Sequence, residues 1–162
     1  MSHRIRFASP HDRAALVEQF QLLNAYEEPF TGNRRLDQAG AEASLLAAEK
    51  RVIDTAGVQL VAECGGSVVG HLFLTFELDA AYVREELRPF AYISELFVRE
   101  PHRRRGIGRA LMAQAERIAA ERGMTRIMVG VLTGNAAAEG AYGRFGFRAH
   151  ATEMSKPIRR PG

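Results

Sequence analysis

Three arginines and two glycines gather in one short segment, the arginine–glycine loop from Arg103 to Gly108. Gly106 and Gly108 carry no side chain that would keep a ligand away from the backbone. The apolar spacing after them predicts a helix, whose first N–H groups and positive dipole end attract phosphate. The arginines add fixed positive charge beside that opening. The loop therefore predicts a site for a phosphate-bearing ligand; the alternative is a glycine-containing turn with solvated arginines.

This loop differs from two common phosphate-binding patterns. The dinucleotide fingerprint needs a third glycine where this chain has Leu111. A nucleoside-triphosphate loop needs a Gly-Lys-Ser/Thr sequence, which does not follow here. Two glycines before a helix are a weak signal by themselves, so the surrounding sequence has to identify the ligand.

Strand and helix patterns alternate around the loop. Apolar residues at every second position predict strands, and apolar residues three or four apart predict helices. Asn135 is a typical helix N-cap residue, while Gly123 and Gly146 are typical of helix ends. The elements predicted from residue 91 onward are a strand at 91–98, a helix from 107 to 123, a strand at 126–131, a helix at 136–145 and a final strand or strand pair at 147–155.

The first half of the chain predicts two helices and a hairpin. The pair Gly65-Gly66 supplies the positive φ that a tight hairpin turn requires. Pro29 predicts a loop over residues 27–33, and Leu45 and Leu46 are predicted to be buried on the second helix. The predicted elements are a strand at 5–7, a helix after Ser9 or Asp12, a helix at 36–51, strands at 58–64 and 68–76, and an irregular segment at 77–89. This order predicts a mixed α/β domain with a partly antiparallel sheet.

Length and composition set broad limits on the protein. At 162 residues, the chain is expected to form one domain over residues 1–157, followed by a tail at 158–162 that frays. The balance of 46% hydrophobic and 25% charged residues is that of a globular protein. The single cysteine, Cys64, excludes a disulfide within this chain and a zinc site with several thiolates. No apolar stretch is long enough for a membrane helix, so we expect a cytoplasmic protein with no membrane partner.

Two separated motifs resemble those of the GCN5-related N-acetyltransferase (GNAT) superfamily. The first is the family pattern Gln/Arg-x-x-Gly-x-Gly/Ala, met here by Arg103, Gly106 and Gly108. The second is similar to the family segment Asn-x-x-Ala…Tyr…Gly-Phe and covers residues 135–147. The resemblance spans residues 92–154 and implies the family fold. That fold is a mixed, mostly antiparallel sheet of six or seven strands, flanked by about four helices, with a splayed strand pair at the acetyl-CoA site.

The resemblance implies acetyl-CoA as a co-substrate and no metal. The strand before the loop is then expected to bind the pantetheine arm along its backbone, and the loop to surround the pyrophosphate through backbone N–H groups. Asn135 matches a position that often contacts the coenzyme, and the alternative is a simple helix N-cap. The cofactor-binding residues implied are Leu96, Phe97, Val98, Arg103, Arg104, Arg105, Gly106, Ile107, Gly108, Arg109, Asn135 and Tyr142.

Two residues are expected to act on the reacting atoms. Acetyl transfer needs a neutral amine, a polarised thioester carbonyl and a proton for the departing thiolate. Tyr142 matches the family tyrosine that lies near the coenzyme sulfur and can act as general acid; the alternative is a core aromatic. Glu95 shares a sheet face with Phe97 and is expected to be the general base; the alternative is a carboxylate paired with arginine. Weaker candidates are His71 and Glu77.

The acceptor side is expected to include Tyr26, Glu27, Phe30 and Tyr92. The acids and aromatics around residue 27 would suit a cationic amine, and the alternative is a solvated loop. The expected function is direct transfer, in a ternary complex, of acetyl from acetyl-CoA to a primary amine of a small or amino-acid-like compound. The alternatives are a protein or peptide N-acetyltransferase and a non-catalytic acetyl-CoA-binding regulatory domain.

Net charge and assembly complete the expectations. The formal charge of +3 could help to attract nucleic acid. The arginines of the loop cluster at one phosphate-sized site instead of forming a long stripe, so we expect no nucleic-acid partner. Members of the resembling family commonly dimerise, which makes a homodimer an expectation of the resemblance.

Overall fold

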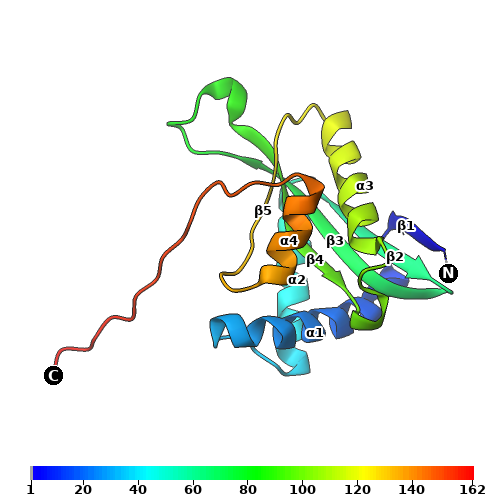
Figure 1. Ribbon diagram of the computed structural model, residues 1–162, viewed down its shortest axis with the longest axis horizontal. Helices are drawn as coiled ribbons and strands as arrows, with labels where there is room; N and C mark the ends of the chain where they lie inside the picture. The colour runs from blue at the N-terminus through cyan, green and yellow to red at the C-terminus, as the bar shows by residue number, and fades with distance from the viewer. Residues whose placement is uncertain (1) are drawn as a thin grey trace.

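The computed structural model describes residues 2–162, which form five strands and four α-helices (Figure 1). No helix in this part of the chain is long and apolar enough to cross a membrane. The strands are β1 (His3–Phe7), β2 (Val58–Cys64), β3 (Ser67–Leu78), β4 (Pro89–Val98) and β5 (Ile127–Val129). The helices are α1 (Arg13–Thr31), α2 (Gln38–Asp54), α3 (Ile107–Glu121) and α4 (Ala136–Phe145). Single 3-10 turns lie at Pro10–Asp12, Glu85–Leu87 and Glu100–His102.

One sheet contains all five strands in the order β1-β2-β3-β4-β5. The first four pair antiparallel, and β5 pairs parallel with β4. The β2–β3 hairpin turns at Gly65 and Gly66, whose φ angles of 57° and 80° are the positive values expected for this tight turn. The predictions of a mixed, mostly antiparallel sheet and about four helices are therefore confirmed.

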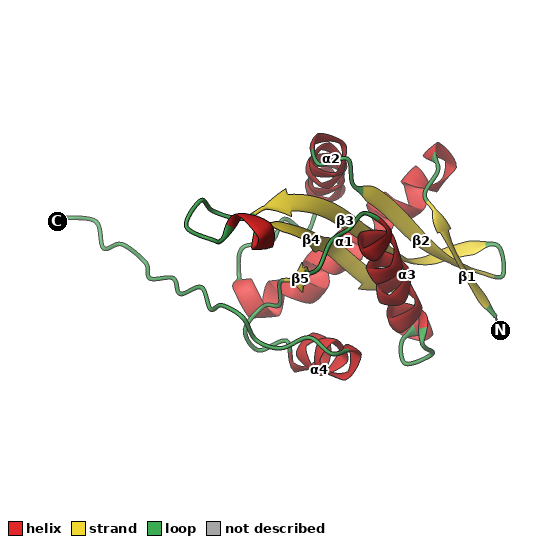
Figure 2. Ribbon diagram, turned by 90° about the horizontal axis from the view of Figure 1, so that it is seen from above, coloured by secondary structure: helices red, strands yellow, loops and turns green. Residues whose placement is uncertain are grey.

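Helices cover both faces of the sheet, which Figure 2 shows from above. The amphipathic α3 packs on one face, and α1 with α2 packs on the other. Each face has its own apolar core, because strand residues alternate between the two. The core on the α1–α2 side comprises Leu16, Phe20, Ala41, Leu45, Ala48, Val52, Val61 and Phe73. The core on the α3 side includes Leu60, Leu72, Leu74, Ala91, Ile93, Leu111 and Ala115.

The expected sheet of six or seven strands is wrong, because the described residues form five. The final strand or strand pair predicted at 147–155 does not form, and residues 148–162 are exposed, without helix or strand. Apolar residues alternate with polar ones only over residues 147–152, and two of the three are small alanines, so a strand here would have little apolar surface to bury. Figure 1 shows this segment leaving the body of the protein. The predicted strand at 126–131 is likewise shorter, with only Ile127–Val129 paired.

The loop predicted over residues 27–33 is also wrong at its start, because α1 continues through Pro29 to Thr31. A proline this near a helix end removes only one hydrogen bond of the last turns. Gly32 then ends the helix in the left-handed conformation, with φ of 66°, and its N–H donates to the Glu28 carbonyl. The extension brings the residues of the last two turns of α1 toward β4 as a rigid surface.

Helix α2 buries only one of its paired leucines. Leu45 is fully buried, whereas Leu46 is 62% exposed, so the prediction that both are buried is wrong for Leu46. Neighbouring residues on a helix point about 100° apart, and the sheet covers only one stripe of α2. Asp37 caps this helix by accepting a hydrogen bond from the Gly40 N–H at 3.0 Å.

Candidate active site

The pairing between β4 and β5 covers only three residue pairs. Ala91, Tyr92 and Ile93 pair with residues 127–129, and β4 then continues to Val98 while β5 stops. A β-bulge at Ser94 interrupts the pairing of β4 with β3, and a bulge bends its strand. Within residues 2–162, the second half of β4 therefore has no strand partner on this side. Its free backbone groups can bind an extended ligand in the way that an added strand would.

The arginine–glycine loop lies directly beyond this open strand edge. Its backbone takes left-handed conformations at Arg104, with φ of 58°, and at Gly106, with φ of 80°. No side chain caps the α3 N-terminus at Gly106, so the first N–H groups of α3 remain available to a ligand. A hollow of about 700 Å³ lies beside the loop, and its lining includes Ala137 at the start of α4. Its other lining residues are Glu100, Pro101, Arg103, Arg104 and Arg105. This combination suits a diphosphate.

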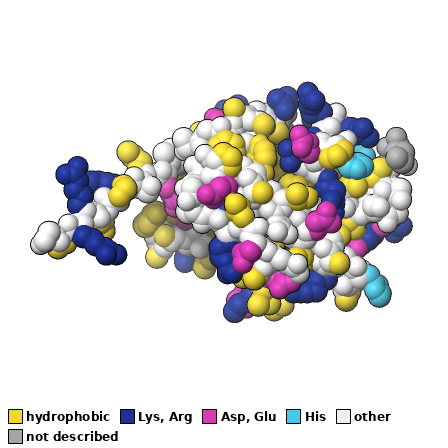
Figure 3. Space-filling view, turned by 90° about the horizontal axis from the view of Figure 1, so that it is seen from below, with side chains coloured by type: hydrophobic (Ala, Val, Ile, Leu, Met, Phe, Trp, Pro, Cys, Tyr) yellow, Lys and Arg dark blue, Asp and Glu magenta, His cyan; other side chains and the backbone are white. Residues whose placement is uncertain are grey.

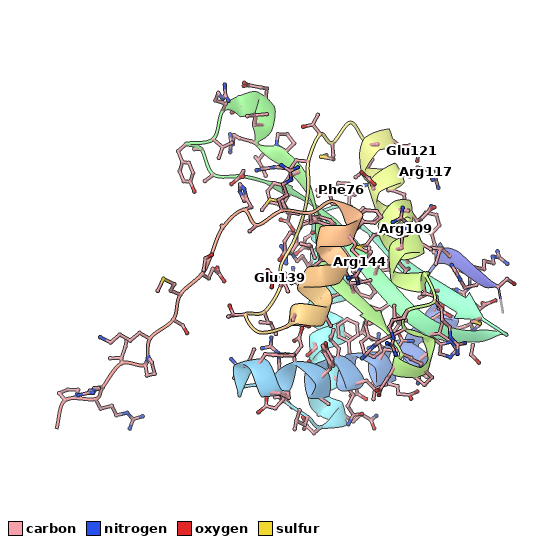
Figure 4. The ribbon with its side chains drawn as sticks, viewed as in Figure 1. Phe76, Arg109, Arg117, Glu121, Glu139 and Arg144 are labelled. Atoms are coloured by element: carbon pink, nitrogen blue, oxygen red, sulfur yellow. The ribbon has the colours of Figure 1, made fainter. Side chains whose placement is uncertain are left out.

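The arginines predicted at the phosphate site take different positions. Arg104 and Arg105 are exposed at the hollow. Arg103 folds back, and its Nε donates to the Val98 carbonyl at 2.8 Å. Arg109 lies on α3 with its guanidinium 6.0 Å from the ring centroid of Phe145 on α4, in the region labelled in Figure 4. Arg104 and Arg105 are thus the arginines best placed to contact a phosphate group in the hollow.

Residues 96–98 of β4 alternate between the two faces of the sheet. Leu96 and Val98 pack against the core on the α3 side. Phe97 is buried on the opposite side, where its ring lies 6.0 Å from that of His71. The side chains are therefore committed to packing, and it is the backbone of this segment that remains for a ligand.

Glu95 lies part-buried next to the open edge, with no hydrogen bond to another side chain in the described part of the chain. Burial raises the pKa of Glu95 to about 7, and repulsion from the Glu27 carboxylate adds to the rise. The positive charges of Arg51 and Arg34 oppose that rise without cancelling it. A carboxyl group with a pKa near neutrality is suited to accept and release protons at physiological pH.

Tyr142 projects from α4 toward the same region. Burial raises the pKa of Tyr142 to about 12, and the charges of Glu27 and Glu95 and the hydroxyls of Tyr92 and Tyr26 contribute further. The phenol therefore keeps its proton at neutral pH and can donate it. Residues that are far apart in the chain, from α1 and β4, thus influence the ionisation of this one side chain on α4.

Asn135 caps α4, as its position before the helix predicts. Its Oδ1 accepts a hydrogen bond from the Ala138 N–H at 3.2 Å. The same oxygen accepts a second hydrogen bond, from the Tyr26 hydroxyl at 3.1 Å. Tyr26 was predicted on the acceptor side, and the structure brings it against the helix start that borders the hollow.

The other residues predicted to bind the acceptor are Glu27, Phe30 and Tyr92. Glu27 accepts a hydrogen bond from Arg34 Nε at 2.8 Å, so this acid is already paired. The Phe30 ring lies edge-on to Tyr26, with centroids 5.8 Å apart. The Tyr92 hydroxyl approaches Gly130, where an added Cβ would lie 2.9 Å from it.

Two arginines of the site were missed from the sequence. Arg34 pairs with Glu27, while Arg51 on α2 lies over the Tyr92 ring, 4.8 Å from its centroid. Arg51 Nε also donates to Glu77 at 2.9 Å, which leaves Glu77 in an ion pair at the rim. Neither arginine lies in a recognisable motif. Both reach the site only through the packing of α1 and α2 against the sheet, which the sequence does not show.

His71, a weaker candidate base, is fully buried beneath the site. Its Nδ1 lies 2.8 Å from Gln19 Oε1, and its ring stacks 4.9 Å from that of Phe20. Burial lowers the pKa of His71 to about 3, so the imidazole is neutral. Among residues 2–162, no group of three or more His, Cys, Asp or Glu side chains is placed to hold a metal ion.

The sequence profile of the Acetyltransferase (GNAT) family matches residues 20–147. This chain belongs to the GNAT family of acetyltransferases. The match includes α2, α3, α4, the whole of β2 to β5 and most of α1, and so contains every residue of the candidate site. A search of curated proteins found no match.

Several solved structures have the same fold as this GNAT protein. A GCN5-related N-acetyltransferase from Ralstonia eutropha is 26% identical, with a TM-score of 0.74 over 97% of this chain and 99% of that one. An aminoglycoside acetyltransferase from an uncultured soil metagenomic sample is 28% identical, with a TM-score of 0.67 over 98% and 100%. AAC(6')-Iy, solved with the bisubstrate analogue CoA-S-monomethyl-acetylneamine, is 16% identical and shows similarity of fold alone, with a TM-score of 0.69 over 98% and 99%.

Proposed function

We propose that this GNAT protein transfers an acetyl group from acetyl-CoA to a primary amine of a small or amino-acid-like acceptor. The observation that carries the proposal is electrostatic: in addition to burial, the Glu27 carboxylate raises the pKa of both Glu95 and Tyr142, and the charge of Glu95 contributes to the raised pKa of Tyr142. One group has a pKa near neutrality and the other keeps its proton, which supplies a base and an acid at one point. Direct transfer in a ternary complex needs both.

We infer one path for acetyl-CoA along the chain. The N-terminus of α3 and the exposed Arg104 and Arg105 would hold its pyrophosphate. The free backbone of residues 94–98 would bind its pantetheine arm. On this path, the thioester would lie near Glu95 and Tyr142.

The chemistry divides between these two side chains. The Glu95 carboxylate accepts the proton of the amine, directly or through a water, as the amine nitrogen attacks the thioester carbonyl carbon. A backbone N–H near Phe97 polarises that carbonyl and stabilises its developing negative charge. When the carbon–sulfur bond breaks, the Tyr142 hydroxyl donates its proton to the departing thiolate. The products are an N-acetylated amine and a free thiol.

The charges at the site support an acceptor that carries polar groups besides its amine. Glu27 and Glu77 each have an arginine partner, so acids and bases alternate around Glu95 instead of forming one anionic surface. Such a site can bind an amine together with other polar groups. Two of the structural relatives are named for aminoglycosides or carry an acetylneamine analogue, which are polar amines of small size.

An acceptor panel tests the proposed function. The protein is incubated with acetyl-CoA and, in turn, small amines, amino acids, polyamines, aminoglycosides and peptides, and free thiol release is measured. We expect release with at least one small amine, and mass spectrometry should find that amine heavier by one acetyl group. Release with peptides alone would favour a protein acetyltransferase. Binding of acetyl-CoA without release for any acceptor would favour a regulatory domain and contradict the proposal.

The distribution of surface charge supports a small-molecule acceptor over a nucleic acid. Figure 3 shows basic and acidic side chains interspersed over the described residues visible in that view, with no continuous basic band across them. Nucleic-acid binding depends on many phosphate contacts and falls steeply with salt. An affinity for DNA or RNA that persists at physiological salt would be unexpected for this protein.

Replacing Gly106 by alanine is expected to weaken CoA binding about tenfold or more. Alanine at φ of 80° is strained and displaces the loop backbone from its phosphate-binding conformation. Gly123 is a matched control, because it has a φ of 76° at the far end of α3 and likewise no atom within 4 Å of an added Cβ. Both variants should lose about 1 kcal/mol of stability, but only Gly106→Ala should lose affinity in calorimetric titrations with CoA. Equal affinities in the two variants would contradict the assignment of the loop.

A further inference from the structure

Tyr26 contacts residues on two sides of the hollow beside the arginine–glycine loop, Arg103 of its lining and Asn135 at the cap of α4. On one side, the Arg103 guanidinium lies over its ring, 5.0 Å from the centroid. On the other side, its hydroxyl donates to Asn135 Oδ1 at 3.1 Å, one residue before the start of α4 and two before Ala137. Arg103 and Ala137 both line the hollow. One side chain of α1 thus joins two segments that are separated along the chain and border the same space.

The contact with Arg103 belongs to a stacked column of side chains. The Arg103 guanidinium also lies 5.6 Å from the centroid of Phe97, and Phe97 stacks on the buried His71. A cation between two aromatic faces is held electrostatically on both sides. Arg103 Nε is engaged as well, with the Val98 carbonyl at the end of β4. Tyr26 therefore closes the outer side of a column that is anchored in the core.

The contact with Asn135 orients the start of α4. Asn135 Oδ1 accepts hydrogen bonds from Tyr26 and from the Ala138 N–H, so the direction of its amide is determined. The same helix carries Tyr142 two turns later. Removing the Tyr26 hydroxyl would leave the amide held by one bond and the helix start free to shift relative to the loop.

We propose that Tyr26 is a positioning residue of the donor site, which holds Arg103 and Asn135 at the separation that CoA requires. This inference rests on the proposed function, since it takes CoA to bind in the hollow and along β4. It differs from the expectation that Tyr26 contacts the acceptor. The two roles predict different changes, in CoA affinity on the one hand and in the acceptor KM on the other.

The test measures CoA binding by isothermal titration calorimetry, without turnover. Tyr26→Phe removes the hydroxyl and keeps the ring, and we expect the Kd for CoA to rise about fivefold, as for loss of one hydrogen bond. Tyr26→Leu removes the aromatic face as well, and we expect a rise of about tenfold or more. The acceptor KM at saturating acetyl-CoA should change by less than about twofold in Tyr26→Phe. Tyr82→Phe makes the same chemical change at a residue that is 90% exposed, and it should leave both constants unchanged.

A double-mutant cycle shows whether the hydroxyl acts through Asn135. In an Asn135→Ala background, Tyr26→Phe should alter the Kd for CoA by less than about twofold. A full fivefold effect in that background, or an unchanged Kd with a raised acceptor KM, would overturn the inference while leaving the proposed function intact. A wild-type protein that binds no CoA would overturn both.

Discussion

Glu95→Gln is expected to lower kcat/KM for the amine about a hundredfold or more, because it removes the group that accepts the amine proton. Glutamine keeps the size and shape of glutamate, but it has no negative charge, and an NH2 group replaces the oxygen that would accept the proton. Glu116→Gln, on the exposed side of α3, is a matched control and should retain full activity. A fall of less than about threefold in Glu95→Gln would contradict the role of Glu95 as general base.

The pH profile gives a second readout of the same substitution. Because the pKa of Glu95 lies near 7, its carboxylate predominates only above neutrality. In the wild type, the logarithm of kcat/KM should rise with a slope near two below pH 7, since both Glu95 and the amine must lose a proton. The slope should fall to about one above pH 7. In Glu95→Gln it should be about one throughout, and an unchanged break near pH 7 would assign that titration to another group.

Glu95→Gln should raise the stability of the folded protein above neutral pH, although it lowers activity. The folded state raises the pKa of Glu95 above its ordinary value of 4.5, so the folded protein holds this proton more strongly than the unfolded chain. The wild type therefore loses stability as the pH rises from about 4.5 through 7. Glu95→Gln has no such charge to bury, and its Tm should exceed that of the wild type at pH 8 but not at pH 4. A lower Tm at pH 8 would indicate that Glu95 stabilises the fold.

Tyr142→Phe should have the second large effect, a fall in kcat of about a hundredfold. The substitution keeps the ring that packs edge-on to Phe147 at 5.8 Å and removes the proton for the departing thiolate. Because the pKa of Tyr142 is about 12, the hydroxyl is protonated from pH 6 to 9. The loss should therefore be the same at every pH in that range, with the KM for acetyl-CoA changed by less than about threefold.

Two controls separate general acid catalysis from packing. The loss in Tyr142→Phe should shrink with a thioester whose thiol is more acidic, since such a thiol leaves without a proton. Tyr82→Phe should be fully active. If the loss is as large with the acidic thiol, or if the KM for acetyl-CoA rises in proportion, Tyr142 supports the site and does not donate the proton.

Much of the donor side could be predicted because it depends on short segments. The cap at Asn135 and the Gly65-Gly66 hairpin both lie where their residue types place them. Each depends on contacts within a few residues, which the order of the residues determines. The two family motifs likewise predicted membership of the GNAT family, which the family match confirms.

The sequence-based predictions failed where contacts between residues far apart in the chain outweigh the local structural preference of a segment. Pro29 predicted a loop, but the last turns of α1 are helical and carry Tyr26 toward α4. Residues 147–155 predicted a strand, but a strand forms only beside a partner with an apolar face to bury, and none is paired with them. Arg51 had no motif at all, and it reaches Tyr92 because α2 packs across the sheet.

The sequence by itself determined the family, the order of the main elements and the position of the arginine–glycine loop before α3, since these follow from local patterns of residue type. Only the tertiary structure decided the chemistry of the site. The pKa of Glu95 depends on burial and on charges from α1, α2 and the loop between them, and that of Tyr142 on four side chains from α1 and β4. Burial and electrostatic interaction depend on distances in space, and those distances exist only once the chain has folded.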